Sequence, residues 1–450
     1  MATNMNVEQP GDASEARWKA YFRMRERNTD TKTEIVAGIT SFLASAYLLV
    51  VIPSLLSAGG IDRAAATTAT ILVIIGATLF MALYANMPFV VGPGIGGSVL
   101  VGPTMAAVEH IPWQTGLAIS FWSSVIFVLL TVLGVRQVIT RMVPAQIKLG
   151  LGAAIGLFIA LLGFKNAGLV DVNARSHALM LGSLNSSQAI VAIFGIFLAV
   201  FLRGRKVPGP ILWAILGSTL LGIPLGITKV PDTLFGVPHG IAETGLQLDF
   251  LGALKLQYFP YLFAFFASEF FSTLGTTLAV GAKAGLVDEA GNMQDLGKPF
   301  LVDSIAATIG PLLGIPSATA LVESATGAEA GGRTGFASLA TAALFALTLL
   351  FTPIALMIPA AATAPALILV GMSMFSALKR VDLENFSDGL SALMMVLLTL
   401  VSNSFGTGIA GGLLFYVIVK VLAGEAKQVS IGMYLLAVPL AYYFWTVAAH

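Results

Sequence analysis

The stretch MPFVVGPGIGGSV, residues 87–99, interrupts one of the many apolar segments of this chain. It places Pro93 among four glycines, so residues 91–98 cannot form a good continuous helix. A related stretch, IPSATALVESATG, occupies residues 315–327, and each has a proline, then a β-branched run, then glycine and serine. Non-helical backbone at membrane depth is tolerated only when protein buries it or when it faces a water-filled cavity. We therefore expect two interrupted segments, each a short strand plus a half-helix, that meet near mid-membrane.

The composition around these stretches defines the class of protein. Hydrophobic residues make up 57% of the 450 residues and charged residues 10%, with a mean hydropathy of +0.88. A soluble protein carries about 25% charged residues. Apolar runs of membrane-spanning length recur along the whole chain. The sequence thus predicts an all-α polytopic protein of the lipid bilayer.

Residue content also argues against several kinds of chemistry. The chain has no cysteine, which excludes disulfides, thiolate metal sites and cysteine nucleophiles. None of its four histidines pairs with another at ligand spacing, so interfacial histidines are favoured over a metal site (His110, His177, His239 and His450). There is no nucleophile–base constellation, which disfavours an enzyme. The net charge of +1 gives no sign of a nucleic-acid partner, and we expect no cofactor other than a coupling proton.

Fourteen candidate membrane segments follow from the apolar runs. They are roughly 34–58, 64–86, 91–108, 113–134, 145–165, 187–203, 209–224, 256–282, 300–314, 317–330, 334–357, 363–378, 387–403 and 405–422. A last apolar stretch covers 431–447, so the number of C-terminal segments stays open by one.

The basic residues give an orientation. Residues 1–33 are polar and lack the apolar core of a signal peptide, which predicts a cytoplasmic tail. Each even-numbered segment then ends inside, where Lys and Arg should gather. Basic residues follow segments four, six, eight, ten and twelve, although not segment two: Arg136, Arg141, Arg203, Arg205, Lys206, Lys283, Lys298, Arg333, Lys379 and Arg380. The sequence predicts a protein of the plasma (inner) membrane with its N-terminus in the cytoplasm.

A weak internal repeat supports two halves of seven segments. RMVPAQIKLGLGAAIGL (141–157) resembles LMIPAAATAPALILVGM (356–372), as 87–99 resembles 315–327. An odd number of segments between copies makes the repeats inverted, and inverted repeats with paired interrupted helices are typical of secondary transporters. Scattered glycines such as Gly150, Gly152 and Gly156 predict close helix packing instead.

Glu269 is the only charged residue between Leu256 and Ala282. Ser272 and Thr273 follow three and four residues later, hence on the same helical face. A charge at mid-membrane costs about 2.5–3.5 kcal/mol on insertion scales and marks a functional site by default. A structural carboxylate paired with a neighbouring helix is the alternative.

Glu323 gives the second signal. Pro316 breaks the preceding helix, and a half-helix can begin at Glu323. The dipole and free N–H groups of a helix N-terminus favour an anion, so Glu323 should stay ionised more readily than the buried Glu269. One carboxylate can carry a proton while the other accepts substrate N–H groups, and which does which stays open.

At these residues the chain resembles the nucleobase:cation symporter-2 family, in particular its hypoxanthine–adenine–guanine permeases, from about Glu34 to Phe444. The most specific segments are TGLAISFWSSVIFVLLTVLGVRQ (115–137), GAKAGLVDEAGN (281–292), VESATGAEAGGRTG (322–335) and IPAAATAPALILVG (358–371). The resemblance implies fourteen segments in two inverted repeats, with a core domain (34–137 and 256–357) moving against a gate domain (138–255 and 358–450), usually in a homodimer. It implies proton-coupled uptake of a purine-like nucleobase or a related planar N-heterocycle.

The resemblance also implies the site. Substrate carboxylates fall on Glu269 and Glu323, which would also couple the proton, and main-chain groups fall near Ser98, Val322 and Ser324. The full expected set adds Ser272, Gly97 and Phe270. Where the permeases have Asp-Leu-Phe-Asp-Thr on segment eight, this chain has EFFST, and it has Ser98 and Ile52 in place of two asparagines. Because a site built for one hydrogen-bonding edge rejects other analogues, a planar heterocycle other than the common purines is compatible with these changes.

Two other classes compete with this interpretation. An anion transporter or channel of the related sulfate-transporter fold needs positive potential at the half-helix ends, and two carboxylates there argue against it. A membrane enzyme lacks the residues noted above. Proton entry with a neutral heterocycle, against electrogenic anion movement, separates the first two.

Overall fold

The computed structural model describes residues 12–134, 144–172, 179–236, 238–287, 293, 296–402 and 405–448. The first eleven residues of the expected tail, the boundary expected between 137 and 138, and two of the basic residues used for orientation, Arg136 and Arg141, lie outside these ranges.

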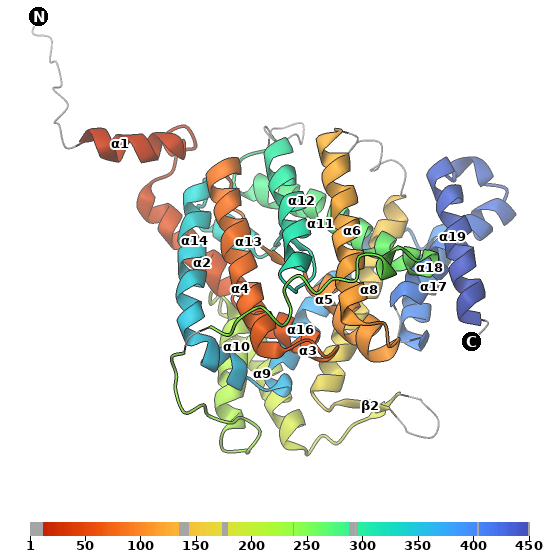
Figure 1. Ribbon diagram of the computed structural model, residues 1–450, viewed down its shortest axis with the longest axis horizontal. Coiled ribbons are helices and arrows are strands. Elements are labelled where there is room, and N and C mark those ends of the chain that lie inside the picture. Colours follow the sequence, from red (N-terminus) through yellow and green to blue (C-terminus); the bar gives the residue numbers. More distant parts are fainter. Residues whose placement is uncertain are drawn as a thin grey trace, which may run out of the picture.

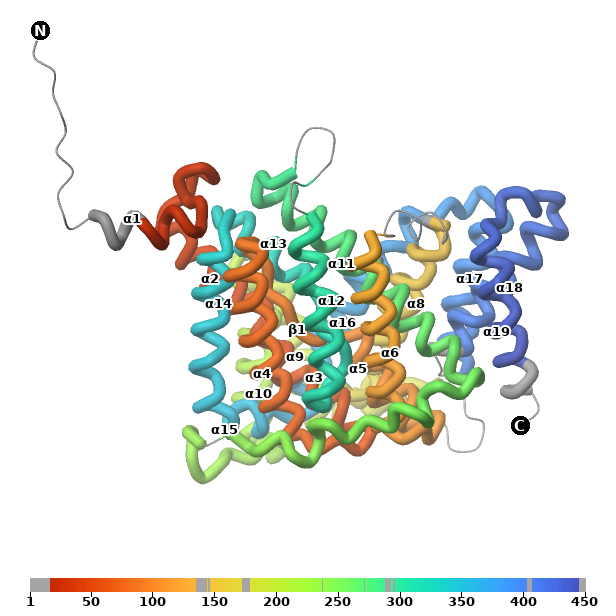
Figure 2. The backbone as a smooth tube through the Cα atoms, turned by 45° about the horizontal axis from the view of Figure 1, so that its top comes forward, coloured from red at the N-terminus to blue at the C-terminus, as the bar shows by residue number. Residues whose placement is uncertain are grey.

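The molecule is a bundle of upright helices, with α1 and α17–α19 at opposite ends (Figures 1 and 2). The α-helices are α1 (Asp12–Tyr21), α2 (Thr31–Ser45), α3 (Leu48–Ser57), α4 (Arg63–Phe80), α5 (Ile95–Val99), α6 (Trp113–Val132), α8 (Ala145–Asn166), α9 (Ser187–Gly204), α10 (Pro210–Gly222), α11 (Phe259–Lys283), α12 (Gly297–Leu312), α13 (Ser324–Glu329), α14 (Gly335–Thr348), α15 (Thr352–Met357), α16 (Ala360–Phe375), α17 (Phe386–Ser402), α18 (Phe405–Leu422) and α19 (Ile431–Ala448). The π-helices are η1 (Met81–Ala85) and η2 (Leu100–Val108), and the 3-10 helices are η3 (Gly252–Leu254), η4 (Leu256–Tyr258), η5 (Leu349–Phe351), η6 (Ser376–Arg380) and η7 (Ala426–Gln428). The strands are β1 (Val91–Pro93), β2 (Val170–Val172), β3 (Leu179–Leu181) and β4 (Ala318–Ala320).

Eight helical segments among the described residues are long and apolar enough to cross a membrane. They are Thr31–Ser57, Arg63–Ala85, Trp113–Val132, Gln146–Asn166, Ser187–Gly204, Leu256–Lys283, Gly335–Met357 and Ala360–Arg380. Five shorter apolar helices are Ile95–Val108, Pro210–Gly222, Phe386–Ser402, Thr407–Leu422 and Ile431–Phe444. The expectation of a helical protein with many membrane segments is confirmed, whereas the number fourteen still rests on the sequence.

The two stretches that break the helical pattern lie side by side. β1 pairs with β4 in antiparallel register, Val91 opposite Ala320 and Gly92 opposite Thr319. In the sequence match between 87–99 and 315–327, Val91 corresponds to Thr319 and Gly92 to Ala320. Exchanging the two stretches therefore converts one pairing into the other, as a two-fold axis between them requires. Each strand leads into a helix, β1 into α5 and β4 into α13.

A second reciprocal contact joins α8 and α16. A Cβ on Gly156 would lie 2.6 Å from the Gly371 carbonyl oxygen, and a Cβ on Gly371 would lie 2.5 Å from the Gly156 oxygen. These two glycines occupy the same place in the matched stretches 141–157 and 356–372. Only a residue without a side chain permits such backbone contact, as expected for Gly156, whereas a Cβ on Gly152 would meet an atom only at 3.8 Å.

The described part of the N-terminal tail packs on the helices. Phe22 and Met24 are buried. The Arg27 guanidinium Nη1 donates to the carbonyl oxygens of Asn86, at 2.6 Å, and Arg333, at 2.7 Å. Asn86 precedes β1 and Arg333 follows α13, so the tail joins the chain connections of both interrupted stretches.

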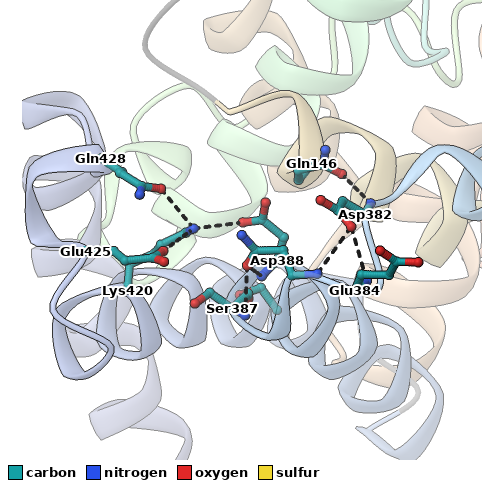
Figure 3. A network of polar contacts seen from close by, with 10 residues as sticks. Gln146, Asp382, Glu384, Ser387, Asp388, Lys420, Glu425 and Gln428 are labelled. Atoms are coloured by element: carbon teal, nitrogen blue, oxygen red, sulfur yellow. Dashed lines mark hydrogen bonds and ion pairs between the residues drawn. The ribbon is translucent and has the colours of Figure 1, made fainter.

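An ion cluster around the buried Lys420 joins the ends of α17 and α18 (Figure 3). The Lys420 ammonium, whose side chain is 3% exposed, lies 2.6 Å from a Glu425 carboxylate oxygen and 3.5 Å from an Asp388 oxygen. It also donates to the Gln428 side chain at 3.1 Å. The cluster compensates a charge that burial would otherwise make costly.

Candidate functional site

A cavity of about 860 Å³ opens where the interrupted stretches meet. One wall comes from α2 and the start of α3, from the β1–α5 and β4–α13 stretches and from α11, and the other from α16 and the connection between α9 and α10. Both glutamates that the sequence predicts as site residues, Glu269 and Glu323, line this cavity.

Glu269 lies in the middle of α11 and is 5% exposed. Its carboxylate accepts hydrogen bonds from the hydroxyls of Ser124, at 3.3 Å, and Ser317. Ser124 belongs to α6, and Ser317 directly precedes β4, so the carboxylate joins two helices to the crossing strand. Ser120, one turn before Ser124, accepts from the Ser317 backbone N–H at 3.1 Å. The hydrogen bonds from these two hydroxyls offset the cost of burying this carboxylate.

Glu323 stands at the start of α13, but its side chain makes no capping hydrogen bond. The hydroxyl of Tyr47 donates to Glu323 Oε1 at 2.6 Å instead. The helix is only six residues long. The expected position of Glu323 is therefore found, while the expected stabilisation by helix N–H groups is replaced by a phenol from the chain between α2 and α3.

Glycines of the first interrupted stretch leave space in the cavity that side chains would otherwise fill. Gly94, Ile95, Gly96 and Gly97 line the cavity. A Cβ on Gly97 would lie 3.5 Å from the Phe265 ring and 3.3 Å from Pro316, so a larger residue there would press against the ring.

Some of the other expected contact residues line the cavity and some do not. Ser272 and Val322 line the cavity, the latter 61% exposed. Ser98 and Ser324 are fully buried and bond to backbone: Ser98 Oγ donates to the Gly94 oxygen at 3.1 Å, and Ser324 Oγ accepts from the Val90 N–H at 2.9 Å. Their side chains thus hold the interrupted stretches in shape, while the expected main-chain contacts of Ser98 and Ser324 with a substrate stay a prediction.

Phe270, another expected contact residue, does not line the cavity in this structure. Its ring is fully buried in an aromatic cluster with Phe127 and Phe300, at centroid distances of 5.7 and 6.2 Å. Adjacent residues on a helix point about 100° apart, so Phe270 cannot share the cavity face of Glu269. Phe265, four residues before Glu269, lines the cavity instead.

Sequence reasoning missed two polar groups of the site. Asp303 on α12 is fully buried and accepts from Thr273, from Thr319 at 3.2 Å and from the Ala320 backbone N–H, so it anchors β4. Asp303 is the only acidic residue between 300 and 314, and the rule that selected Glu269 selects it too. For Tyr47 no comparable signal exists, because a tyrosine within an apolar run is ordinary.

Charged residues gather at the mouth of the cavity. Arg203 and Lys206 lie on the wall from the α9–α10 connection. Lys283 and Glu329, on the opposite wall, form an ion pair with each other. The interior thus carries carboxylates and the mouth carries three cations and one anion.

Similar proteins cover nearly the whole chain. A candidate permease of Methanocaldococcus jannaschii, MJ0326, is 39% identical over 424 residues, covering 94% of this chain and 97% of that protein. The adenine permease AdeP of Escherichia coli is 32% identical, with 91% and 92% covered. The guanine/hypoxanthine permease PbuG of Bacillus subtilis is 33% identical, with 95% and 99% covered.

A solved structure shares the fold. The transmembrane domain of a cyanobacterium bicarbonate transporter, BicA, matches with a TM-score of 0.63 at 16% identity, covering 84% of this chain and 96% of that one.

A model of the Permease family, Xan_ur_permease, matches residues 32–413. The chain therefore belongs to this family, the nucleobase:cation symporter-2 permeases, and is a transporter rather than an enzyme.

Proposed function

We propose that this protein is a secondary active transporter that takes up a purine-like nucleobase, or a related planar N-heterocycle, together with protons. The observation that carries the proposal is the placement of Glu269 and Glu323 in one cavity, beside the paired strands β1 and β4. Relatives named as adenine and guanine/hypoxanthine permeases support the substrate class.

The chemistry of binding follows from the two carboxylates. A carboxylate has two oxygens that accept hydrogen bonds, and a nucleobase presents ring N–H groups along its edge. Hydrogen bonds to an ionised group are roughly twice as strong as neutral ones. Tyr47 fixes one oxygen of Glu323, which leaves the rest of this carboxylate for a substrate. Ser272 lines the same cavity and sets which further donors and acceptors the substrate needs.

Coupling requires that one carboxylate change its protonation between the two sides of the membrane. Glu269 is held by two serine hydroxyls, and a hydroxyl can donate to a carboxylate or accept from a carboxyl group. This environment suits a group that gains and loses a proton in place. Either glutamate can serve as this group.

The movement we propose is a displacement of the core domain against the gate domain. Core residues 34–137 and 256–357 supply Glu269, Glu323 and Gly97, while gate residues 138–255 and 358–450 supply Arg203 and Lys206. The cavity opens on the face that carries these cations. With the N-terminus in the cytoplasm of a plasma-membrane protein, this is the inward-facing state. Fourteen segments in two inverted repeats are supported by the reciprocal pairings of β1 with β4 and of Gly156 with Gly371; a homodimer completes the proposal.

An anion transporter is the second candidate, favoured by the fold shared with BicA and by the cations at the mouth. Its weakness is the interior, where an anion would meet Glu269 and Glu323.

Uptake into proteoliposomes tests the proposal. We expect radiolabelled adenine, guanine or hypoxanthine to accumulate under an inward proton gradient, without dependence on added anions. Glu269→Gln should abolish accumulation while leaving the variant folded, and Glu323→Gln should in addition weaken binding. Accumulation by Glu269→Gln at the wild-type rate would assign this carboxylate a structural role. Transport of bicarbonate or sulfate, without transport of any nucleobase, would favour the second candidate.

A further inference from the structure

We propose that Tyr47 sets which purines the site prefers, because it occupies one oxygen of the Glu323 carboxylate and leaves the other to hold a single N–H group of the substrate. Tyr47 is fully buried, so it acts on a substrate only through Glu323 and is a positioning residue. The inference rests on the proposed function, since it concerns a nucleobase bound at this carboxylate.

Close packing of α13 on α2 brings the two side chains together. A Cβ on Gly327 would collide with the Ser41 hydroxyl and lie 2.8 Å from the Ala37 carbonyl oxygen, so α13 packs directly on the backbone of α2. Tyr47 follows α2 by two residues, and Glu323 directly precedes α13. The packing of the two helices therefore places the phenol beside the carboxylate.

The connection after α13 is fixed to the same helix. Glu34, fully buried near the start of α2, accepts hydrogen bonds from the backbone N–H groups of Arg333, at 2.9 Å, and Ala337, at 3.1 Å. Residues 323–337 are thus held by α2 at both ends and in the middle. The bond from Tyr47 to Glu323 is the part of this framework that reaches the cavity.

The bond makes the two oxygens of Glu323 unequal. The Tyr47 hydroxyl donates to Oε1 at 2.6 Å, and a hydrogen bond to an ionised carboxylate is a strong one. Within the part of the chain that the structure describes, no other side chain donates to this carboxylate. Glu323 itself is half-buried and lines the cavity. Oε2 is therefore the better acceptor for a substrate N–H, whereas Oε1 is shared with the phenol.

Two purines that differ by one amine would use such a carboxylate differently. Hypoxanthine presents one N–H at ring position 1, while guanine adds an amine on the neighbouring carbon and so presents two parallel N–H groups. Paired donors of this kind match both oxygens of a carboxylate, as those of arginine do. Because the phenol competes for Oε1, the second donor of guanine gains little in the wild-type protein. Removal of the phenol hydroxyl should favour guanine over hypoxanthine.

The test is equilibrium binding of guanine and hypoxanthine to purified full-length protein, with thermal unfolding to verify folding. Tyr47→Phe should shift the ratio of the two dissociation constants towards guanine by about tenfold, as one more hydrogen bond to an ionised group predicts. Tyr47→Met also lacks the donor and should shift the ratio in the same direction, which provides a second variant if the first folds poorly.

Two controls separate this role from packing. Tyr443→Phe removes another buried phenol hydroxyl, which lies 2.9 Å from the Thr407 hydroxyl and away from the cavity wall, and should leave the ratio unchanged. Glu323→Gln lacks the second acceptor oxygen. In that background, adding Tyr47→Phe should change the ratio by less than about twofold, the usual limit for independent effects.

An unchanged ratio in the folded Tyr47 variants would overturn the inference, whatever happens to the absolute affinities. The full shift in the Glu323→Gln background would also overturn it, because the phenol would then act elsewhere. Wild-type protein that binds adenine but neither guanine nor hypoxanthine would contradict the use of this N–H edge. Wild-type protein that binds no purine would instead refute the proposed function, which distinguishes the two failures.

Discussion

Asp303 offers a sharp test of how the site is built, because its carboxylate holds strand β4 without touching the cavity. Oδ1 accepts from the Ala320 backbone N–H, and Oδ2 accepts from the hydroxyls of Thr273 and Thr319. Thr319 lines the cavity. Removal of the carboxylate should therefore shift strand β4, which lies just before Glu323 in the chain.

The magnitude follows from the groups left behind. In Asp303→Ala the Ala320 N–H is buried without a partner, which costs about 1–3 kcal/mol. The two threonine hydroxyls lie 3.2 Å apart and can bond to each other, so they add little. In Asp303→Asn the amide oxygen can still accept from Ala320, and the amide N–H₂ can donate to the hydroxyls. The asparagine variant should therefore recover most of the stability that alanine loses.

The assay is thermal unfolding of the purified variants, followed by purine binding to the folded protein. Asp303→Ala should unfold at lower temperature and bind more weakly, with Asp303→Asn between it and wild type in both. Equal unfolding midpoints for the two variants would refute the account, because then neither the N–H of Ala320 nor the strand depends on this acceptor.

Three further predictions concern packing outside the cavity, all measured by thermal unfolding. Lys420→Met removes the cation from its cluster and should cost on the order of 3 kcal/mol, as when one partner of a buried ion pair is lost; an unchanged midpoint contradicts this. Arg27→Ala removes two hydrogen bonds to backbone carbonyls and should cost about 1–3 kcal/mol, while the exposed Arg25→Ala should change nothing; equal effects argue against the role of the tail. Gly156→Ala places a Cβ 2.4 Å from a backbone nitrogen and should separate α8 from α16, whereas Gly152→Ala has space; tolerance of both would contradict the close contact.

The sequence predicts the class of protein and the two main carboxylates for a physical reason. Long apolar runs place these segments in the bilayer. A lone charge within such a run is costly there and marks a functional site by default, so Glu269 can be selected without a structure. The proline and glycines of residues 91–98 likewise exclude a continuous helix, and the structure has β1 and α5 there.

The contacts of individual side chains are less predictable. Ser98, Ser324 and Phe270 have suitable chemistry and the right neighbourhood, but each turns towards backbone or other rings. Which way a short side chain turns depends on the partner helix, and the sequence does not state which helices are neighbours. For the same reason the bond from Tyr47 to Glu323 joins residues far apart in the chain and has no local signature.

The claim that these two carboxylates bind a nucleobase is tested most directly by the affinity of Glu323→Gln. Glutamine keeps the shape of the side chain and removes the anion, so a lost charged hydrogen bond should cost about 1.5–3 kcal/mol. We predict a Kd about 10- to 150-fold above wild type for the purine that binds best, measured by titration calorimetry on folded protein. Glu329→Gln, on the same short helix but paired with Lys283 at the mouth, serves as the control and should bind within about threefold of wild type. An affinity of Glu323→Gln equal to wild type would contradict the account, because Glu323 would then not touch the substrate.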